Sequence, residues 1–275
     1  MSAPVSAFAI QEYGDARVAA VIPARNEAHT IAEVVRETAR YVHDVLVLDG
    51  GSRDGTAEQA RAAGARVITD RGRGKGAAVR QSLGETTADI LVFLDADGSH
   101  DPADIPSLVR PVLARDAELC VGSRFSGGTD ELSVTVGQLI RTIGNISMNI
   151  AINRRFDVAL TDTLNGFRAV RREVALEVQL AEDRHTIEQE MVMKVLTYGY
   201  RVVNRPTHEY ARLFGTSHIA VWREWPTFVR CVLVNIFQPQ RARSYASNTH
   251  GARVKPALET WMRASRPHER TSAGS

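Results

Sequence analysis

The sequence predicts an α/β fold in which a mostly parallel central sheet is flanked by helices. Short runs rich in β-branched residues alternate with segments of helical periodicity in the first half of the chain, a pattern typical of parallel strands joined by helical crossovers. Polar turns follow several of these runs. The chain has 275 residues, 44% of them hydrophobic, which is enough to bury the core of one large domain.

The elements of the first half follow from these patterns in order. Apolar residues at helical spacing predict helices that begin at Ile31, near Thr56 and near Lys75. A further helix should follow Pro102, with Asp101 as its N-cap, because proline lacks the N–H that a first helical turn does not use. The strands are expected at 18–23, 45–48, 66–69, 90–94 and 118–122.

The second half is predicted to be mainly helical. Segment 126–133 has the composition of a loop, and 137–152 has helical patterning. Thr186 followed by Gln189 predicts a capping box at the start of a helix that ends at Gly199. A strand is expected at 201–205, then helical structure at 219–237 that Pro226 should kink or divide.

Bulk properties exclude several classes of protein. The net charge of +2 gives no reason to expect nucleic acid binding. The two cysteines, Cys120 and Cys231, lack metal-ligand or C-x-x-C spacing and are interpreted as buried free thiols of a reducing compartment. Neither a secretory signal nor a long apolar span is evident, so a cytoplasmic location is expected.

Two aspartates follow the expected strand at 90–94, in the stretch VFLDADGSHDP. If strand alternation continues, Asp95 and Asp97 point the same way at the carboxyl end of the strand, where open α/β sheets bind ligands. Two carboxylates this close favour a hard divalent cation such as Mg²⁺ or Mn²⁺, which also binds water and substrate phosphates. A lone D-x-D is more often one turn-capping aspartate beside a solvated one, so the neighbouring motifs must decide.

Two other strand ends should lie at the same edge. VIPARNE places Arg25, Asn26 and Glu27 after the first strand, and VLVLDGGSRDGT places Asp49 and Gly50 after the second. The Asp49 carboxylate could accept hydrogen bonds from a nucleobase, or it could form a turn beside the glycines.

The stretch RGRGKGAAVRQSL could bind an anion. It places Lys75 and Gly76 at the start of a helix, where a cation and free backbone amides can meet a phosphate. The spacing of a Walker A loop is absent, and no G-x-G-x-x-G follows the first strand, which removes the usual dinucleotide interpretation.

Taken in order, VIPARNE, LDGGSRDGT, GKGAA, FLDADGSHDP and VGSRF resemble the motifs of family 2 glycosyltransferases of the GT-A fold. Within that family the motifs resemble those of the dolichol-phosphate mannose synthases and similar polyprenyl-phosphate glycosyltransferases. The resemblance covers about 18–219, since TDTLNGFRAVRRE and EYARLFGTSHI look like the family's acceptor-side segments D-x-x-S-G-F-R and R-x-x-G-x-S-K.

The resemblance implies a role for each matching residue. It implies that the divalent ion binds Asp95 and Asp97, that the ribose lies near Ala96, and that Arg124 and Arg212 supply positive charge to substrate phosphates. The residues expected to catalyse are Asp97, Asp162, Arg124 and Arg212. The remaining residues expected to bind the donor are Pro23, Ala24, Arg25, Asn26, Glu27, Asp49, Gly50, Lys75, Gly76 and His218.

The chain departs from the family pattern at four positions. Gly50 stands where a second aspartate is common, and Ser99 stands where a glutamine can assist the metal. On the acceptor side, Asn165 replaces the serine of S-G-F and His218 replaces the lysine of the last motif. These changes bear most on the identity of the acceptor.

The resemblance also implies an organisation of the chain. We expect an N-terminal extension, 1–16, a nucleotide-sugar-binding half, 17–124, and an acceptor-side half of the same domain, 125–239. The tail, 240–275, is basic and is expected to be flexible: from 241 onward it has seven Arg or Lys against two Glu.

The expected reaction is metal-dependent, inverting transfer of a hexose from GDP-mannose or a UDP-hexose to a polyprenyl phosphate. A phosphate acceptor is already mostly dianionic at neutral pH and needs no general base. A hydroxyl acceptor needs one, for which Asp162 comes first and Glu188 and Glu190 next. Alternatives are a soluble acceptor, a nucleotidyltransferase, and a non-catalytic nucleotide-sugar binding module.

Expected partners include the membrane surface. The apolar residues of 219–237 and the basic tail could rest on an anionic bilayer, or the helix could simply pack on the core. A homodimer is compatible with the sequence, which does not fix the oligomeric state. The apolar residues concerned are Trp222, Trp225, Phe228, Val229, Val232, Leu233 and Phe237.

Overall fold

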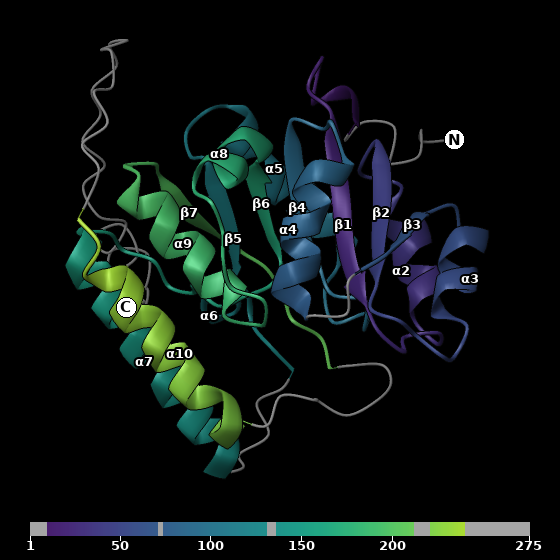
Figure 1. The fold of residues 1–275 in the computed structure, drawn as a ribbon. Helices are drawn as coiled ribbons and strands as arrows, with labels where there is room; N and C mark the ends of the chain where they lie inside the picture. Colours follow the sequence, from purple (N-terminus) through teal and green to yellow (C-terminus); the bar gives the residue numbers. More distant parts are fainter. Residues whose placement is uncertain (1–9, 71–73, 131–135, 212–220, 240–275) are drawn as a thin grey trace, which may run out of the picture.

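The computed structural model describes residues 10–70, 74–130, 136–211 and 221–239. Among these residues, seven strands form one sheet in the order β3-β2-β1-β4-β6-β5-β7 (Figure 1). Every neighbouring pair is parallel except the two that involve β6, which runs antiparallel to both β4 and β5. The predicted fold class, an α/β domain with a mostly parallel sheet, is therefore confirmed.

The strands and helices follow the sequence patterns closely. The strands are β1 (Val18–Ala24), β2 (Asp44–Asp49), β3 (Arg66–Thr69), β4 (Ile90–Phe93), β5 (Leu119–Ser123), β6 (Arg168–Arg171) and β7 (Val202–Pro206). The helices are α2 (Ile31–Thr38), α3 (Thr56–Ala62), α4 (Lys75–Glu85), α5 (Ile105–Leu113), α6 (Arg124–Gly127), α7 (Val136–Phe156), α8 (Arg172–Glu177), α9 (Ile187–Thr197) and α10 (Val221–Ile236). A short 3-10 turn, Pro102–Asp104, precedes α5 and is capped by the Asp101 side chain as predicted.

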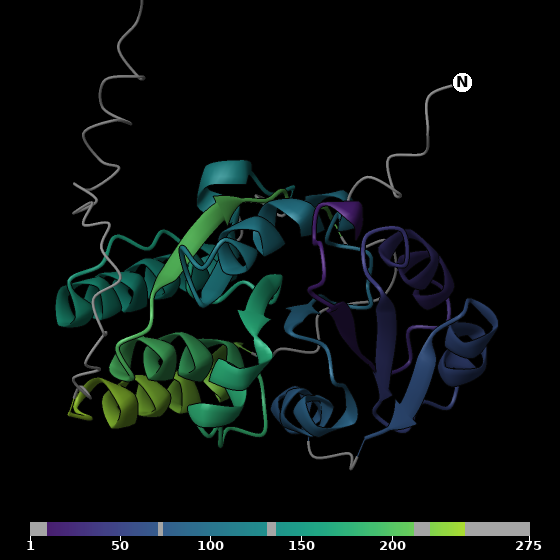
Figure 2. The ribbon, with the colours of Figure 1, turned by 90° about the horizontal axis from the view of Figure 1, so that it is seen from above.

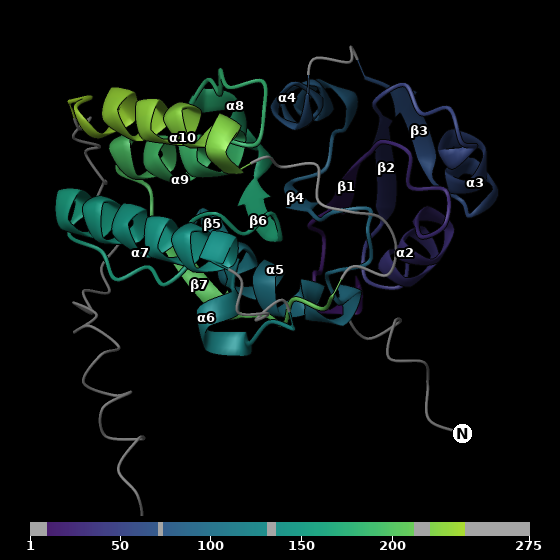
Figure 3. The same cartoon turned by 90° about the horizontal axis from the view of Figure 1, so that it is seen from below.

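Helices cover both faces of the sheet because successive side chains of a strand point to opposite faces. In β1, Ala19 and Val21 belong to one buried cluster, and Val18, Ala20 and Ile22 belong to the other. The first cluster packs under α4, α7, α8, α9 and α10, and the second under α2 and α5. Figure 3 shows α4, α8, α9 and α10 on one side of the strands and α2 and α5 on the other.

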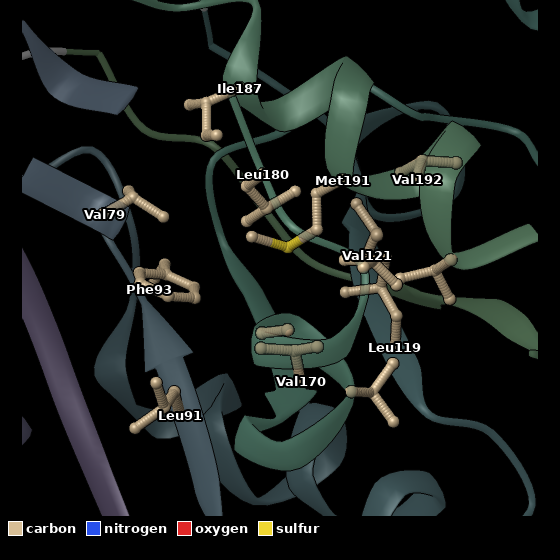
Figure 4. Close-up of a cluster of buried hydrophobic side chains, with 14 of the residues drawn as sticks. Val79, Leu91, Phe93, Leu119, Val121, Val170, Leu180, Ile187, Met191 and Val192 are labelled. Carbon is tan, nitrogen blue, oxygen red and sulfur yellow. The ribbon is translucent and has the colours of Figure 1, made fainter. Parts of the chain in front are cut away.

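The first cluster joins the two predicted halves of the chain. Val79 of α4 and Phe93 of β4 lie with Val170 of β6 and Met191 of α9 in one apolar layer (Figure 4). Because β6 and β7 complete the sheet begun by β1 to β5, segments 17–124 and 125–239 share one sheet and one core. Figure 2 shows α7, α9 and α10 gathered beside the β7 end of that sheet, away from β3.

Strand β6 was not expected from the sequence. It has only two apolar residues, Ala169 and Val170, between Arg168 and Arg171, so it lacks the β-branched run that marks the other strands. The neighbouring strands fix it, since it forms a ladder with β4 on one side and β5 on the other.

The predicted capping box at α9 is wrong, although the helix starts where expected. Thr186 itself has helical backbone angles and makes no side-chain cap; its hydroxyl donates to Glu182 Oε2 at 2.6 Å instead. The side-chain amide of Gln189 donates to the sulfur of Met148 on α7. The Thr186 side chain therefore makes a local contact and the Gln189 side chain a tertiary one, and neither caps the helix.

Other expectations of the second half are partly met. Helix α10 runs through Pro226 without being divided, and α9 ends before Gly199, which has φ +76°. The start of the expected loop at 126–133 belongs to α6, and 131–135 lies outside the described residues, as do the predicted tail and the site residues Arg212 and His218. Within the part of the chain that the structure describes, no helix is long and apolar enough to cross a membrane.

Candidate active site

The candidate site lies at the carboxyl edge of β2, β1 and β4, which are neighbours in the sheet. Ala24 pairs with Asp49 at the end of the β1–β2 ladder, and the Gly50 amide donates to the Ala24 carbonyl at 2.9 Å. The hydroxyl of Thr30, at the start of α2, donates to the Ala96 carbonyl at 2.7 Å. The three strand ends predicted to converge are therefore adjacent.

The turn after β1 is held by its own polar side chains. Asn26 has φ +57°, a left-handed conformation that asparagine tolerates better than most residues. Its amide donates to Ser52 Oγ at 2.9 Å, and its side-chain oxygen accepts from the Arg53 amide at 3.0 Å. Asn26 thus ties the turn after β1 to the turn after β2.

Asp49 lies buried at the floor of this part of the site. Both its carboxylate oxygens lie 3.3 Å from the Ser52 amide, which is the turn-forming geometry that the sequence left open. A Cβ added to Gly50 would lie 3.5 Å from Asp70 Oδ2, so the Asp70 carboxylate borders the position where relatives often have a second aspartate. Asp70 was not singled out from the sequence, because it follows β3 rather than β2.

Asp95 and Asp97 do not continue the alternation of β4. The strand ends at Phe93, and residues 96 and 97 form a turn, so the argument that both side chains point the same way does not extend to them. Asp97 is 4% exposed, and its Oδ1 accepts from the Ser99 amide at 3.1 Å and the Ser99 hydroxyl at 2.7 Å. Ser99 therefore positions Asp97.

Asp95 lies in a network of charged groups from three elements. Its Oδ1 is 2.5 Å from Nζ of Lys75, the first residue of α4, and Lys75 Nζ is also 2.7 Å from Oε1 of Glu188 on α9. Burial raises the pKa of Asp95, but the opposing effects of Lys75 and His100 are larger and leave it well below its usual value. The carboxylate is therefore ionised at neutral pH.

His100 is an unexpected member of this network. It is buried and stacked on Phe167 with ring centroids 5.0 Å apart, and its Nε2 is 3.6 Å from Asp95 Oδ2, too long for a hydrogen bond. Neither ring nitrogen has a hydrogen-bond partner among the residues that the structure describes. The one sequence signal for His100 is its place directly after D-x-D-x-S.

The acceptor-side motif reaches the same carboxylate through Gly166. A Cβ added there would lie 2.9 Å from Lys75 Nζ and 3.2 Å from Asp95 Oδ2. Arg168, only 1% exposed, fixes this segment by donating to the carbonyls of Asn165 and Glu188. Burial lowers the pKa of Arg168 to about 10, so the guanidinium stays charged at neutral pH.

Arg124 and Asp162 form a two-point ion pair. Arg124 Nε lies 2.7 Å from Asp162 Oδ2, its second terminal nitrogen lies 3.2 Å from Oδ1, and its first lies 3.2 Å from Glu209 Oε2. Asp162 is fully buried and also accepts from the amides of Leu164 and Asn165. Its lone pairs are thus occupied, which fits an anchor for Arg124 better than a general base.

The glycines beside Lys75 serve packing. A Cβ on Gly76 would lie 2.3 Å from the Glu182 carbonyl, and one on Gly74 would lie 2.7 Å from the Asp183 carbonyl. The Ala77 amide donates to the Asp183 carbonyl at 3.1 Å. Segment 182–184 therefore accepts the Ala77 amide of the first turn of α4. This turn contacts Asp95 through the Lys75 side chain.

Comparison with known proteins assigns this arrangement to a family. The sequence model described as glycosyl transferase family 2 matches residues 19–178, more than half of the chain. The chain belongs to glycosyltransferase family 2.

Relatives of this glycosyltransferase have been named in archaea and bacteria. It is 33% identical over 202 residues to glycosyltransferase AglJ of Haloferax volcanii, covering 73% of this chain and 65% of AglJ, so it spans less than two thirds of that protein. It is 32% identical over 220 residues to an undecaprenyl-phosphate mannosyltransferase of Micrococcus luteus, covering 74% of this chain and 88% of the relative.

Solved structures show the GT-A fold of this glycosyltransferase. The glucosyl-3-phosphoglycerate synthase of Mycobacterium tuberculosis, solved with Mn²⁺, UDP and glucosyl-3-phosphoglycerate, superposes with a TM-score of 0.68 at 22% identity over 87% of each chain. The same synthase has been solved with Mg²⁺ and UDP, with a TM-score of 0.67 at 22% identity over 87% of this chain and 86% of the synthase. At this identity the likeness supports the fold alone.

Proposed function

We propose that the protein transfers a hexose from a nucleotide diphosphate sugar to a polyprenyl phosphate, with Mg²⁺ or Mn²⁺ as cofactor and inversion at the anomeric carbon. The observation that carries the donor half is the contact of Asp95 with Lys75 at the carboxyl edge of the sheet, two residues before the buried carboxylate of Asp97. The polyprenyl phosphate is supported by the name of the Micrococcus luteus relative and by the sequence motifs. The solved synthase complexes with Mn²⁺ or Mg²⁺ and UDP support the donor and the metal.

The residues present fit a divalent ion that is shared with its substrate. Among the described residues no group of three acidic, histidine or cysteine side chains could enclose a metal. Two carboxylates, Asp95 and Asp97, suit Mg²⁺ or Mn²⁺, which commonly take few protein ligands and complete their shell with water and phosphate oxygens. When bound there, the ion would neutralise the charge that develops on the leaving nucleoside diphosphate.

The protein's own residues would bind and orient the substrates. The turns held by Asn26 and Asp49 would receive the nucleoside, with Pro23, Ala24, Arg25, Glu27 and Gly50 beside them. Arg124, fixed by Asp162 and Glu209, would orient the substrate phosphates, and the resemblance gives Arg212 and His218 a part in the same task. The Gly166 backbone would bring the acceptor-side segment next to the diphosphate.

A hydroxyl acceptor is the second candidate, because the structure offers a base for it. Glu188 Oε1 is 2.7 Å from Lys75, which contacts Asp95, and within the described part of the chain the buried Glu188 Oε2 has no hydrogen-bond partner. A carboxylate with a free oxygen this close to the donor site could take a proton from a hydroxyl. Glu190 could not, since its carboxylate is occupied by Lys194 and by the Ala181 and Glu182 amides.

Glu188→Gln separates the two acceptors. If the acceptor is a phosphate monoester, kcat should change by less than about tenfold; if it is a hydroxyl, the loss of a general base should lower kcat by about 10²-fold or more. Transfer is measured with one donor and either undecaprenyl phosphate or a panel of sugars and phosphorylated metabolites. A large loss with undecaprenyl phosphate that appears in kcat and shifts the pH profile would contradict the phosphate assignment.

A lipid acceptor agrees with the outer face of α10. This helix packs against α9 and buries Cys231 and Val232, whereas Leu233 is 51% exposed and Phe237, directly after the helix, is 80% exposed. The basic segment 240–275 follows directly in the sequence. Apolar side chains beside clustered positive charge are the composition that binds anionic bilayers.

Charging this face should release the protein from vesicles. We expect Leu233→Glu combined with Phe237→Glu to reduce co-sedimentation with anionic phosphatidylglycerol vesicles severalfold, because two carboxylates would have to approach the apolar region of the bilayer. Leu176→Glu is the matched control, since Leu176 is 45% exposed on α8. Deleting 241–275 tests the electrostatic part. Equal binding by all variants would exclude this surface.

A further inference from the structure

Lys75 holds the position that a cation would take between two carboxylates. Its Nζ lies 2.5 Å from Asp95 Oδ1 and 2.7 Å from Glu188 Oε1; the side chains of Lys75 and Glu188 are mostly buried, and that of Asp95 is partly exposed. The carboxylates come from the end of β4 and the start of α9, so the ammonium joins the donor edge to the acceptor-side half of the chain. Without a positive charge between them, two carboxylates in this position would repel each other.

A second lysine pair on α9 shows what a purely structural contact looks like here. Lys194 Nζ lies 2.8 Å from Glu190 Oε1 and also donates to the Gln179 carbonyl at 2.6 Å. The Glu190 carboxylate accepts from two backbone amides as well. This second pair is saturated, whereas Glu188 keeps one buried oxygen for which the described residues offer no hydrogen-bond partner.

The surroundings of Lys75 leave its ammonium room to move. Gly166 has no side chain at the place where a Cβ would lie 2.9 Å from Nζ, and Asp95 is 31% exposed on the side of the site. A lysine has a flexible four-carbon stem, so its ammonium can shift by several ångströms while the backbone of α4 stays fixed.

We propose that Lys75 is a resident counter-cation: it holds Asp95 and Glu188 together in the metal-free protein and moves to the donor diphosphate when a divalent ion binds Asp95. This inference rests on the proposed metal-dependent function. It assigns Lys75 two opposite effects, since the ammonium competes with the free metal ion but stabilises the bound nucleotide. A lysine that only bound phosphate would have the second effect alone.

Lys75→Met tests the competition directly. Without nucleotide, its Mn²⁺ dissociation constant should fall at least about fivefold, because the ion no longer has to displace an ammonium from Asp95. With Mn²⁺ saturating, its dissociation constant for UDP or GDP should rise about tenfold, because one charge-assisted contact to the diphosphate is lost. Mn²⁺ binding is measured by the EPR signal of the free ion, and nucleotide binding by calorimetry.

Three variants make the result decisive. Lys194→Met removes a comparable buried lysine and should leave Mn²⁺ affinity unchanged. Lys75→Arg keeps the positive charge and should retain the weak Mn²⁺ affinity of the wild type, which covers the case in which Lys75→Met does not fold. Asp95→Asn should abolish the tight Mn²⁺ site in either background.

The outcomes distinguish the role of Lys75 from the existence of the metal site at Asp95. Unchanged or weaker Mn²⁺ binding by a folded Lys75→Met protein, or tighter binding by Lys75→Arg, would overturn the role of Lys75 while Asp95→Asn still loses the metal. Full Mn²⁺ binding by Asp95→Asn would instead overturn the proposed metal site itself.

Discussion

Asp97→Asn is expected to lower sugar transfer by about 10³-fold or more, because the carboxylate that would bind the divalent ion loses its charge. The asparagine oxygen can still accept from the amide and hydroxyl of Ser99, so the turn after β4 should keep its shape. The thermal stability without ligand should therefore change little.

The same variant identifies the donor. Each candidate, GDP-mannose or a UDP-hexose, is added with Mn²⁺, and the melting temperature is recorded; a ligand that binds only the folded protein stabilises it by RT ln(1 + [L]/Kd). The correct donor should raise the wild-type Tm, and Asp97→Asn should lose the metal-dependent part. Asp116→Asn, on the exposed surface before β5, is the control. Full stabilisation of Asp97→Asn would disprove the assigned site.

Gly166→Ala is expected to reduce transfer by about 10²-fold, because the added methyl group would lie against Lys75 Nζ and Asp95 Oδ2. Gly166 does not have a positive φ angle, so alanine introduces no backbone strain and the effect comes from this contact. The methyl group must displace either the ammonium or the carboxylate, and both belong to the donor site. The variant should remain folded while Mn²⁺-dependent nucleotide binding weakens.

Gly84→Ala controls for the substitution. Gly84 lies in α4, where a Cβ would meet nothing within 4 Å, so alanine should leave activity unchanged and raise helix stability slightly. Transfer rates, Tm and calorimetric Kd for the nucleotide are compared for the two variants. Wild-type activity in Gly166→Ala would show that the acceptor-side segment does not need this close approach.

Most of the fold could be predicted because its signals are local. β3 was placed at its observed bounds, and the Asp101 cap with Pro102 behind it was correct. β6 could not be predicted because two apolar residues are too few to indicate a strand. Its pairing with β4 and β5 fixes it. The Thr186 cap failed because Thr186 has helical backbone angles, and its hydroxyl donates to Glu182, four residues earlier.

The candidate site could likewise be predicted only in part from the sequence. Motifs at strand ends identified Asp95, Asp97 and Asp49, because position at a sheet edge follows from the order of elements along the chain. Contacts between distant segments did not follow from it. Nothing local in the sequence indicates that Glu188 meets Lys75, or that Glu209 and Asp162 share one arginine. These contacts depend on where the fold places α9 and the segment after β7.

The reversed direction of β6 has an evolutionary consequence. The parallel strands end at the carboxyl edge of the sheet, so the loops that follow them lie there. Because β6 runs in the opposite direction, it begins at this edge, and the segment that precedes it, 157–167, lies there instead. This segment connects α7 to the sheet. Loops that could grip the donor and the segment that could select the acceptor are therefore separate stretches of chain that meet in space. In such a layout, mutation or loop grafting can change the acceptor segment while the nucleotide-side loops stay intact. The same fold can then serve different acceptors.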